Sequence, residues 1–297
     1  MQIDKALPGV KKNILLKNYT TFRIGGKAKY FFVAKNKEDL IAAIKLAKKL
    51  KLPFFVLGGG SNILVSDKGF NGLVIKIENC KLKIENCKLS AESGVPLGKL
   101  VNISVEKSLT GLEWAVGIPG TVGGAIYGNA GAFKKSMKGI AREVEAFDAK
   151  DLRFKIYDLR KCRFSYRDSV FKKNKNLIIL SAVLQLRKGK KSEIKKEIEE
   201  NLKARAEKQP LNFPSVGSIF KNPPGFLSFA AARLIEECGL KGKRVGNVKI
   251  SEKHANFIVN LGGGRAKDVM RLIKIIKNRV KNKFGVILEE EIQFLGF

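Results

Sequence analysis

The first 78 residues alternate between short apolar runs and one amphipathic segment. Residues 30–34 (YFFVA) and 72–77 (GLVIKI) are apolar runs of strand length, and 53–57 (PFFVL) is a third that leads directly into three glycines. Between them lies a predicted helix at 38–50, because one face of it collects the apolar residues Leu40, Ile41, Ile44, Ala47 and Leu50. The pattern predicts a small β-α-β unit with a glycine turn at the carboxyl end of a strand.

The next 110 or so residues are predicted to be rich in strands. The hexapeptide IENCKL occurs at 77–82 and again at 84–89, which predicts two adjacent strands of a meander. A helix is predicted at 97–108. Further strands are predicted at 144–148, 154–158 and 177–186.

The remainder of the chain mixes helices and strands. A charged helix is predicted at 192–208 and ends before Pro210. After it we expect helices at 228–238 and 266–283 and strands at 256–260 and 286–295. The whole order predicts an α+β fold with three domains, at residues 1–78, 79–188 and 189–297.

Composition places the chain among folded globular proteins, because 44% of its residues are hydrophobic and 8% are aromatic. No apolar run approaches the ~20 residues that a membrane span needs. The first residues lack the apolar core of a signal peptide, so we expect a cytoplasmic protein. A single histidine and four cysteines without a CxxC pair predict that there is no metal site.

The net charge of +31, from 58 basic and 27 acidic residues, leaves two interpretations open. One is a nucleic-acid-binding protein. The other is a lysine-rich surface that attracts small polyanions such as dinucleotides. The basic residues are spread over the whole chain and accompany no zinc-finger, RRM or basic-zipper pattern, which favours the second interpretation and no nucleic-acid partner.

Two glycine-rich segments are candidates for binding a nucleotide. In the first, a strand opens into Gly58, Gly59 and Gly60, followed by Ser61 and Asn62; glycines let backbone N–H groups approach a phosphate closely. The second runs over 111–133 and contains seven glycines with interspersed apolar residues. Ordering such a chain costs conformational entropy and gains little side-chain packing, which makes sense if its backbone lies against a dinucleotide. A tight hairpin and a flexible loop are the alternatives for the two segments taken singly.

Several motifs, read in order, resemble those of the UDP-N-acetylenolpyruvoylglucosamine reductase family. The stretches that carry the resemblance are NYTTFRIGG (18–26), VLGGGSNILVSD (56–67), GIPGTVGGAIYGNAGAF (117–133), FSYRDSVFK (164–172), PSVGSIFKNP (214–223), KHANFIVN (253–260) and LEEEI (288–292). The resemblance implies a vanillyl-alcohol-oxidase-type, two-part FAD-binding region followed by a C-terminal α+β substrate domain. It also implies an NADPH-dependent reduction of UDP-N-acetylglucosamine enolpyruvate to UDP-N-acetylmuramate in peptidoglycan precursor synthesis.

The resemblance further implies the cofactor site. Neither glycine-rich segment contains a histidine, so we expect FAD to be bound noncovalently. The expected FAD-binding residues are Arg23, Gly58, Gly59, Gly60, Ser61, Asn62, Ile118, Pro119, Gly120, Thr121, Gly123, Gly124, Asn129, Ala130 and Gly131.

Three catalytic residues follow from the resemblance. Arg167 matches the arginine of the family motif, and its planar fork suits a carboxylate. Ser218 matches the serine general acid. The third is a C-terminal glutamate: alignment selects Glu291, whereas strand alternation alone would select Glu290, which shares a face with apolar residues. The expected substrate-binding residues are Tyr166, Lys221, Asn222 and Lys253.

The chain also departs from part of the family. Only a few residues separate Phe171 from the strand predicted at 177–186, which leaves no room for the tyrosine-bearing loop that some members close over the substrate. We therefore expect the shorter subclass. Separately, we expect the chain to act as a monomer. A flavin oxidase of the same fold, acting on an alcohol or a hydroxy acid, is the alternative enzyme.

Overall fold

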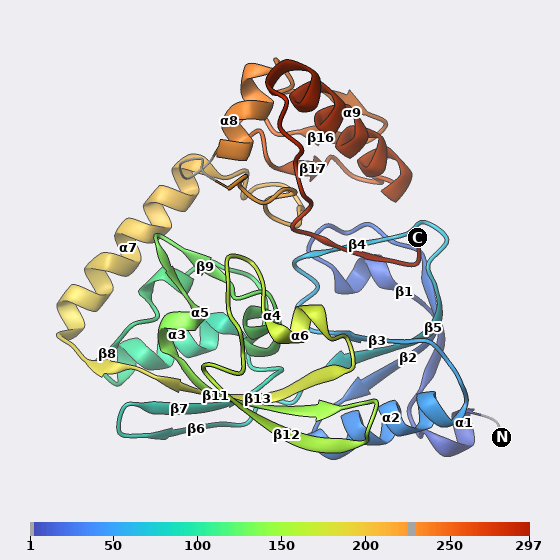
Figure 1. Cartoon of the computed structure of the whole chain (residues 1–297), viewed down its shortest axis with the longest axis vertical. Coiled ribbons are helices and arrows are strands. Elements are labelled where there is room, and N and C mark those ends of the chain that lie inside the picture. Colours follow the sequence, from blue (N-terminus) through green and yellow to red (C-terminus); the bar gives the residue numbers. More distant parts are fainter. Residues whose placement is uncertain (1–2, 225–229) are drawn as a thin grey trace. The chain divides into compact units, whose positions relative to one another are not determined.

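The structure, a computed structural model, describes residues 3–224 and 230–297 and divides into two compact units (Figure 1). Unit 1 comprises residues 1–11, 30–59 and 72–205, and unit 2 comprises residues 12–29, 60–71 and 206–297. The predicted division into three domains stays a prediction. The first glycine-rich segment is shared, with Gly59 in unit 1 and Gly60 in unit 2.

The N-terminal part of unit 1 forms around helix α2 (Lys37–Lys49). This helix begins at Asn36, whose side-chain oxygen accepts a hydrogen bond from the N–H of Asp39 at 2.7 Å. Its apolar face is buried at Leu40, Ala43, Ile44 and Ala47, as the spacing predicts. The other elements here are α1 (Ile3–Ala6), β2 (Lys27–Ala34), β3 (Phe54–Leu57) and β5 (Phe70–Ile77). The three strands belong, with β1 (Lys11–Leu15), to a sheet of order β1-β2-β5-β3, in which β3 and β5 are parallel.

The rest of unit 1 is built on an antiparallel sheet of order β12-β11-β13-β7-β6. Its strands are β6 (Leu82–Glu85), β7 (Lys88–Glu92), β11 (Ala141–Asp148), β12 (Arg153–Asp158) and β13 (Leu177–Gln185). Alternate residues of β13 point to different cores: Ile179 packs with Trp114 and the helices, whereas Ile178 packs with the apolar face of α2. Strand β13, at the centre of the sheet, is therefore buried on both faces.

Helices α3, α4 and α5 cover one face of this sheet (Figure 1). The remaining elements of unit 1 are short, apart from the long helix α7: α3 (Leu97–Glu106), β8 (Leu109–Thr110), a 3₁₀ turn (Glu113–Ala115), α4 (Val122–Tyr127), β9 (Gly131–Ala132), β10 (Lys135–Ser136), α5 (Met137–Ile140), α6 (Val170–Lys173), β14 (Arg187–Lys188) and α7 (Lys191–Lys208). Helix α4 lies inside the second glycine-rich segment and was not predicted.

Unit 2 has its own core, in which α8 and α9 pack with a three-stranded antiparallel sheet of order β15-β16-β17. Helix α9 ends at Gly285, whose φ of 70° is the left-handed conformation that glycine adopts without strain. Strand β18 pairs in parallel with β4. The elements are a 3₁₀ turn (Leu16–Tyr19), β4 (Ile63–Val65), α8 (Ala230–Glu237), β15 (Arg244–Val245), β16 (Val248–Ile250), β17 (Ile258–Asn260), α9 (Ala266–Phe284) and β18 (Gln293–Leu295).

Three predicted elements differ from the structure. The strand predicted at 286–295 is regular only at β18, with one isolated bridge between Glu290 and Phe220. The strand predicted at 256–260 begins at Ile258. The first IENCKL copy lies mostly in the loop between β5 and β6, so the two copies are not paired strands; β6 and β7 form the hairpin instead, around Asn86. The start of the helix predicted at 228–238 lies outside the described residues.

Within the described residues, no helix is long and apolar enough to cross a membrane. The same residues contain no group of three or more His, Cys, Asp or Glu side chains arranged to hold a metal ion.

Candidate active site

The first glycine-rich segment follows β3 directly, and a half-buried lysine holds its beginning. Lys76 of β5 donates a hydrogen bond from Nζ to the carbonyl oxygen of Gly58 at 2.9 Å. Burial of this ammonium group lowers the pKa of Lys76. Sequence reasoning missed Lys76, because its position in an apolar strand gives no sign of what it contacts.

Within unit 1 the two glycine-rich segments touch each other. A Cβ atom on Gly58 would lie 2.8 Å from Oγ1 of Thr121, and one on Gly59 would lie 2.6 Å from Cα of Gly120. Real Cβ atoms do not approach that closely, so these glycines allow the segments to meet backbone to backbone. The two segments lie about 60 positions apart in the sequence, and both were predicted from it to belong to one cofactor site. The structure brings them into contact.

Helix α4 begins at Thr121, whose hydroxyl oxygen accepts from the N–H of Gly124. The N–H of Gly123 donates to the carbonyl of Ser93, and a Cβ there would lie 2.8 Å from Cβ of Ser93. Close packing against Ser93 therefore explains why position 123 is glycine. Contact of Gly123 with FAD stays a prediction.

Two buried polar atoms near this helix have no protein hydrogen-bond partner in the described part of the chain: Oγ of Ser93 and Nδ2 of Asn79. Buried polar groups normally find a partner, so they suit a site that receives a polar ligand. Together with the meeting of Gly59 and Gly120, they fit a dinucleotide cofactor laid along the glycine-rich backbone.

The remainder of the first segment belongs to unit 2, where it lies beside the C-terminal segment. A Cβ on Gly60, whose φ is 65°, would clash with the carbonyl of Tyr19. The side chain of Asn62 donates to the carbonyl of Glu291 at 3.2 Å. Arg23 has a φ of 54°, and its carbonyl accepts from the amide of Asn260 at 3.4 Å. A predicted cofactor residue, Asn62, is therefore in contact with the predicted catalytic Glu291.

Arg167 projects from a tight turn whose ends, Ser165 and Asp168, exchange backbone hydrogen bonds. Its φ of 55° is unusual for a residue other than glycine, and such strain is often found at functional positions. The guanidinium lies over the ring of Tyr166, with 5.5 Å between the guanidinium carbon and the ring centroid.

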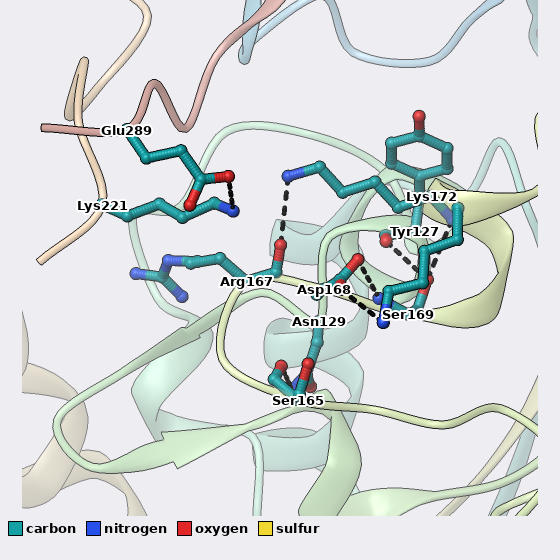
Figure 2. Close-up of polar contacts among 10 residues, drawn as sticks. Tyr127, Asn129, Ser165, Arg167, Asp168, Ser169, Lys172, Lys221 and Glu289 are labelled. Atoms are coloured by element: carbon teal, nitrogen blue, oxygen red, sulfur yellow. Dashed lines mark hydrogen bonds and ion pairs between the residues drawn. The ribbon is translucent and has the colours of Figure 1, made fainter. Parts of the chain in front are cut away.

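Asn129 fixes this turn to the end of the second glycine-rich segment (Figure 2). Its side-chain N–H donates to the carbonyl of Ser165 at 2.7 Å, and its oxygen accepts from the N–H of Lys138 at 2.9 Å. Ser169 adds a bond from its hydroxyl to the carbonyl of Tyr127 at 2.7 Å. The sequence placed Asn129 among the FAD-binding residues; in the structure its side chain positions the turn that carries Arg167.

In unit 2, Ser218 lies in an extended strip held on both sides. The N–H of Ile219 donates to the carbonyl of Asn256, and the carbonyl of Ile219 accepts from the N–H of Glu291 at 2.8 Å. The side chain of Asn256 bonds both the N–H and the carbonyl of Phe220. The strip brings the backbone of the Ser218 motif against the backbone of Glu291.

The three C-terminal acids have different environments. Glu289 pairs with Lys221, with 2.5 Å between Nζ and the carboxylate (Figure 2). Glu290 pairs with Lys277 of α9 at 2.8 Å. Glu290 is thus engaged in an ion pair within unit 2, which supports the choice of Glu291 that alignment makes.

The other predicted substrate residues lie elsewhere in unit 2. The side-chain oxygen of Asn222 accepts from the N–H of Ala231 at 3.2 Å. Lys253 donates to the carbonyl of Ala206 and lines a hollow of about 410 Å³ with Lys249 and Phe213. The single histidine, His254, packs on Phe257, and burial lowers its pKa, as suits a neutral structural side chain.

Comparison with known proteins gives the same order of regions. Residues 28–150 match the FAD binding domain model, and residues 209–295 match the model for the C-terminal domain of UDP-N-acetylenolpyruvoylglucosamine reductase. The reductase of Caldanaerobacter subterraneus subsp. tengcongensis is 44% identical over 95% of this chain and 92% of the relative. The chain belongs to the UDP-N-acetylenolpyruvoylglucosamine reductase family. The family member from Clostridium novyi is 42% identical over 97% of this chain and 92% of its own length.

A solved structure supports the family assignment. The reductase from Thermus caldophilus has a TM-score of 0.81 and 37% sequence identity, and the match covers 96% of this chain and 98% of that one. The predicted family, the α+β fold and the FAD-binding region are therefore confirmed. The roles of individual site residues stay predictions.

Proposed function

We propose that the chain reduces UDP-N-acetylglucosamine enolpyruvate to UDP-N-acetylmuramate, with NADPH as reductant, as a step of peptidoglycan precursor synthesis. The observation that carries this proposal is the 44% identity to a named reductase over nearly the full length of both chains. The presence of the family's Arg167, Ser218 and Glu291 motifs supports it. FAD, when bound, supplies hydride transfer from NADPH to the substrate.

Arg167 binds the carboxylate of the enolpyruvyl group. Hydride addition to the alkene moves an electron pair toward the neighbouring carbon and its carboxylate. A cation at the carboxylate therefore stabilises the transition state more than it stabilises the bound substrate. A guanidinium forms two parallel hydrogen bonds to such a group, which fixes its orientation as well as its charge. The strained turn and its bonds to Asn129 hold this guanidinium in place.

Replacing Asn129 by alanine is expected to lower turnover about tenfold, because it removes the side-chain bonds to the carbonyl of Ser165 and the N–H of Lys138 and so loosens the Arg167 turn. Asn129→Asp keeps the acceptor for Lys138 but loses the donor to Ser165, and it should be impaired to a similar degree. Steady-state kinetics and the flavin content of both variants provide the measurement. A loss of bound FAD without a loss of turnover per flavin would assign Asn129 to the cofactor instead.

Ser218 delivers the proton that completes the reduction. The carbanion next to the carboxylate needs one proton, and a serine hydroxyl is a weak acid that must be positioned to give it. The strip between Asn256 and Glu291 supplies that positioning, because hydrogen bonds on both sides fix the backbone that follows Ser218.

Glu291 is the third catalytic residue. Glu291→Gln is expected to lower turnover about 10- to 50-fold, the range for losing a charge-assisted hydrogen bond. Glu290→Gln is the matched control: it breaks only the half-exposed pair with Lys277 and should leave turnover within about twofold. The measurement is kcat with the enolpyruvyl nucleotide for both variants. The reverse ranking would transfer the role to Glu290.

The activity is tested on the purified protein. We expect a yellow protein whose flavin is released by denaturation, and NADPH oxidation that depends on the enolpyruvyl nucleotide and yields UDP-N-acetylmuramate. NADPH oxidation that is slow and indifferent to this nucleotide, or consumption of an alcohol substrate instead, would contradict the proposal.

We further propose that the enzyme acts in the cytoplasm as a monomer that binds NADPH and the enolpyruvyl nucleotide but no nucleic acid. Size-exclusion chromatography with light scattering tests the monomer. Binding of a DNA duplex with a steep salt dependence would contradict the exclusion of nucleic acid.

A further inference from the structure

Arg205 is a buried cation on a helix whose residues are mostly charged and exposed. It lies near the end of α7 and is only 8% exposed. One of its terminal nitrogens donates to the carbonyl of Trp114 at 3.4 Å, and its guanidinium carbon lies 5.4 Å from the ring centroid of Phe133. Its stem contacts Gly117, where a Cβ would lie 3.2 Å from the arginine's Cδ. Arg205 therefore sits against the second glycine-rich segment, within unit 1.

The positive charge of Arg205 is not neutralised by the part of the chain that the structure describes. No carboxylate of those residues forms an ion pair with it, and its Nε is buried without a hydrogen-bond partner. Burial of the guanidinium lowers the pKa of Arg205, and repulsion by the positive charge of Arg167 lowers it further. A buried guanidinium that no carboxylate neutralises costs free energy, and an apolar side chain would anchor α7 without that cost.

We propose that Arg205 and Arg167 form a two-guanidinium oxyanion site that receives the carboxylate of the enolpyruvyl nucleotide. This inference rests on the proposed function. An oxyanion is the ligand that would offset the buried charge and give the orphaned Nε a partner. The guanidinium of Arg205 lies over the ring of Phe133, which restricts its orientation.

The reaction explains why two cations serve better than one. Hydride adds to the terminal methylene carbon, the π electron pair moves to the carbon that carries the ether oxygen, and the charge spreads into the carboxylate. The enolpyruvyl group therefore carries one negative charge before hydride addition and two after it. The proton from Ser218 then returns its charge to one. Arg167 balances the charge already present, and Arg205 balances the charge that develops.

Two nucleotides distinguish the carboxylate from the diphosphate. UDP-N-acetylmuramate carries a carboxylate and UDP-N-acetylglucosamine does not. With the FAD-loaded Arg205→Met variant, calorimetry should show about 10- to 100-fold weaker binding of the first nucleotide and binding of the second within about twofold. Lys203→Met, at an exposed position of the same helix, removes one charge without this contact and should change neither affinity.

The two halves of the reaction give an independent measurement. Reduction of Arg205→Met by NADPH, followed by flavin absorbance, should stay within about threefold of the parent. Reoxidation by saturating enolpyruvyl nucleotide should slow about 100-fold, because the charge develops in that half. Arg205→Lys restores the charge but not the fork, so part of this rate should return.

Several results would overturn the inference. Parent-like affinity and rates in Arg205→Met would do so, as would equal losses for both nucleotides, which indicate a diphosphate contact or a structural role. If Arg205→Met is reduced more slowly by NADPH and no longer prefers NADPH over NADH, Arg205 would instead bind the phosphate that distinguishes NADPH from NADH. If Arg205→Met loses FAD or unfolds, Arg205→Lys provides the test instead. A folded Arg205→Lys variant whose affinity falls equally for the two nucleotides would contradict the inference. Failure of the parent enzyme to turn over the nucleotide is a different result and contradicts the proposed function.

Discussion

Ser218→Ala is expected to lower turnover of the enolpyruvyl nucleotide about 1,000-fold while reduction by NADPH proceeds at the parent rate. General acids contribute about 10²- to 10⁴-fold to such reactions, and removal of the serine hydroxyl leaves the carbanion without its proton donor. The backbone of this strip is held by bonds between Ile219 and its neighbours Asn256 and Glu291, none of which involves the Ser218 hydroxyl. The change therefore removes one oxygen atom and leaves the positioning of the strip intact.

Stopped-flow measurement of flavin absorbance separates the two halves of the reaction for this variant. Ser215→Ala is a local control, since the recorded contact of Ser215 is made by its backbone carbonyl, which accepts from the hydroxyl of Thr21. It should retain near-parent rates in both halves. An equal loss of both halves in Ser218→Ala would show that Ser218 supports the cofactor or the fold, and it would remove the serine from the role of proton donor.

Elements with a clear period could be predicted from the sequence. The buried face of α2 and the strands β11 and β13 follow the spacing of apolar residues. Each of these elements packs against the protein core along its whole length, so its apolar residues recur with a regular period. Helix α4 could not be predicted that way, since Gly123 and Gly124 are poor helix formers. It forms because Thr121 caps it and its first N–H groups donate to carbonyls of the loop before α3.

The C-terminal segment shows where alternation fails. Leu288 and Ile292 are buried as alternation predicts, but Phe294 is exposed and Leu295 is buried, so the facing changes after Ile292. A single strand over 286–295 was therefore wrong, and the side chain of Glu290, between Leu288 and Ile292, pairs with Lys277. Its contact with Lys277 depends on the distant helix α9, which no local pattern contains.

The candidate site was predicted mainly by motif resemblance. A motif does not show which charged side chains become buried in the folded chain. Arg205 lies in a helix in which most residues are charged or polar, so its sequence position predicts a solvated side chain. Only the folded structure shows that it packs against Trp114 and Phe133. Lys76 was missed for the converse reason, because a lysine in an apolar strand gives no indication of the glycine-rich segment that it holds.

Gly59→Val is expected to yield a folded protein that binds little FAD and turns over at least about 100-fold more slowly per polypeptide. Even a Cβ on Gly59 would lie 2.6 Å from Cα of Gly120, and both atoms belong to backbone that has no flexible end to move aside. The two glycine-rich segments must then separate. Overpacking costs about 1–3 kcal/mol for a well-packed site, and valine adds two further methyl groups to that clash.

The ratio of flavin to protein after purification measures the loss, and titration with FAD measures the remaining affinity. Gly59→Ala should lie between parent and Gly59→Val, with FAD binding about 10- to 100-fold weaker than in the parent. Gly98→Ala is the control: a Cβ at this position of α3 meets nothing within 4 Å, so FAD content should be unchanged and thermal stability equal or slightly higher. Parent-like FAD affinity in Gly59→Val would mean that the contact between the two segments is not part of the cofactor site.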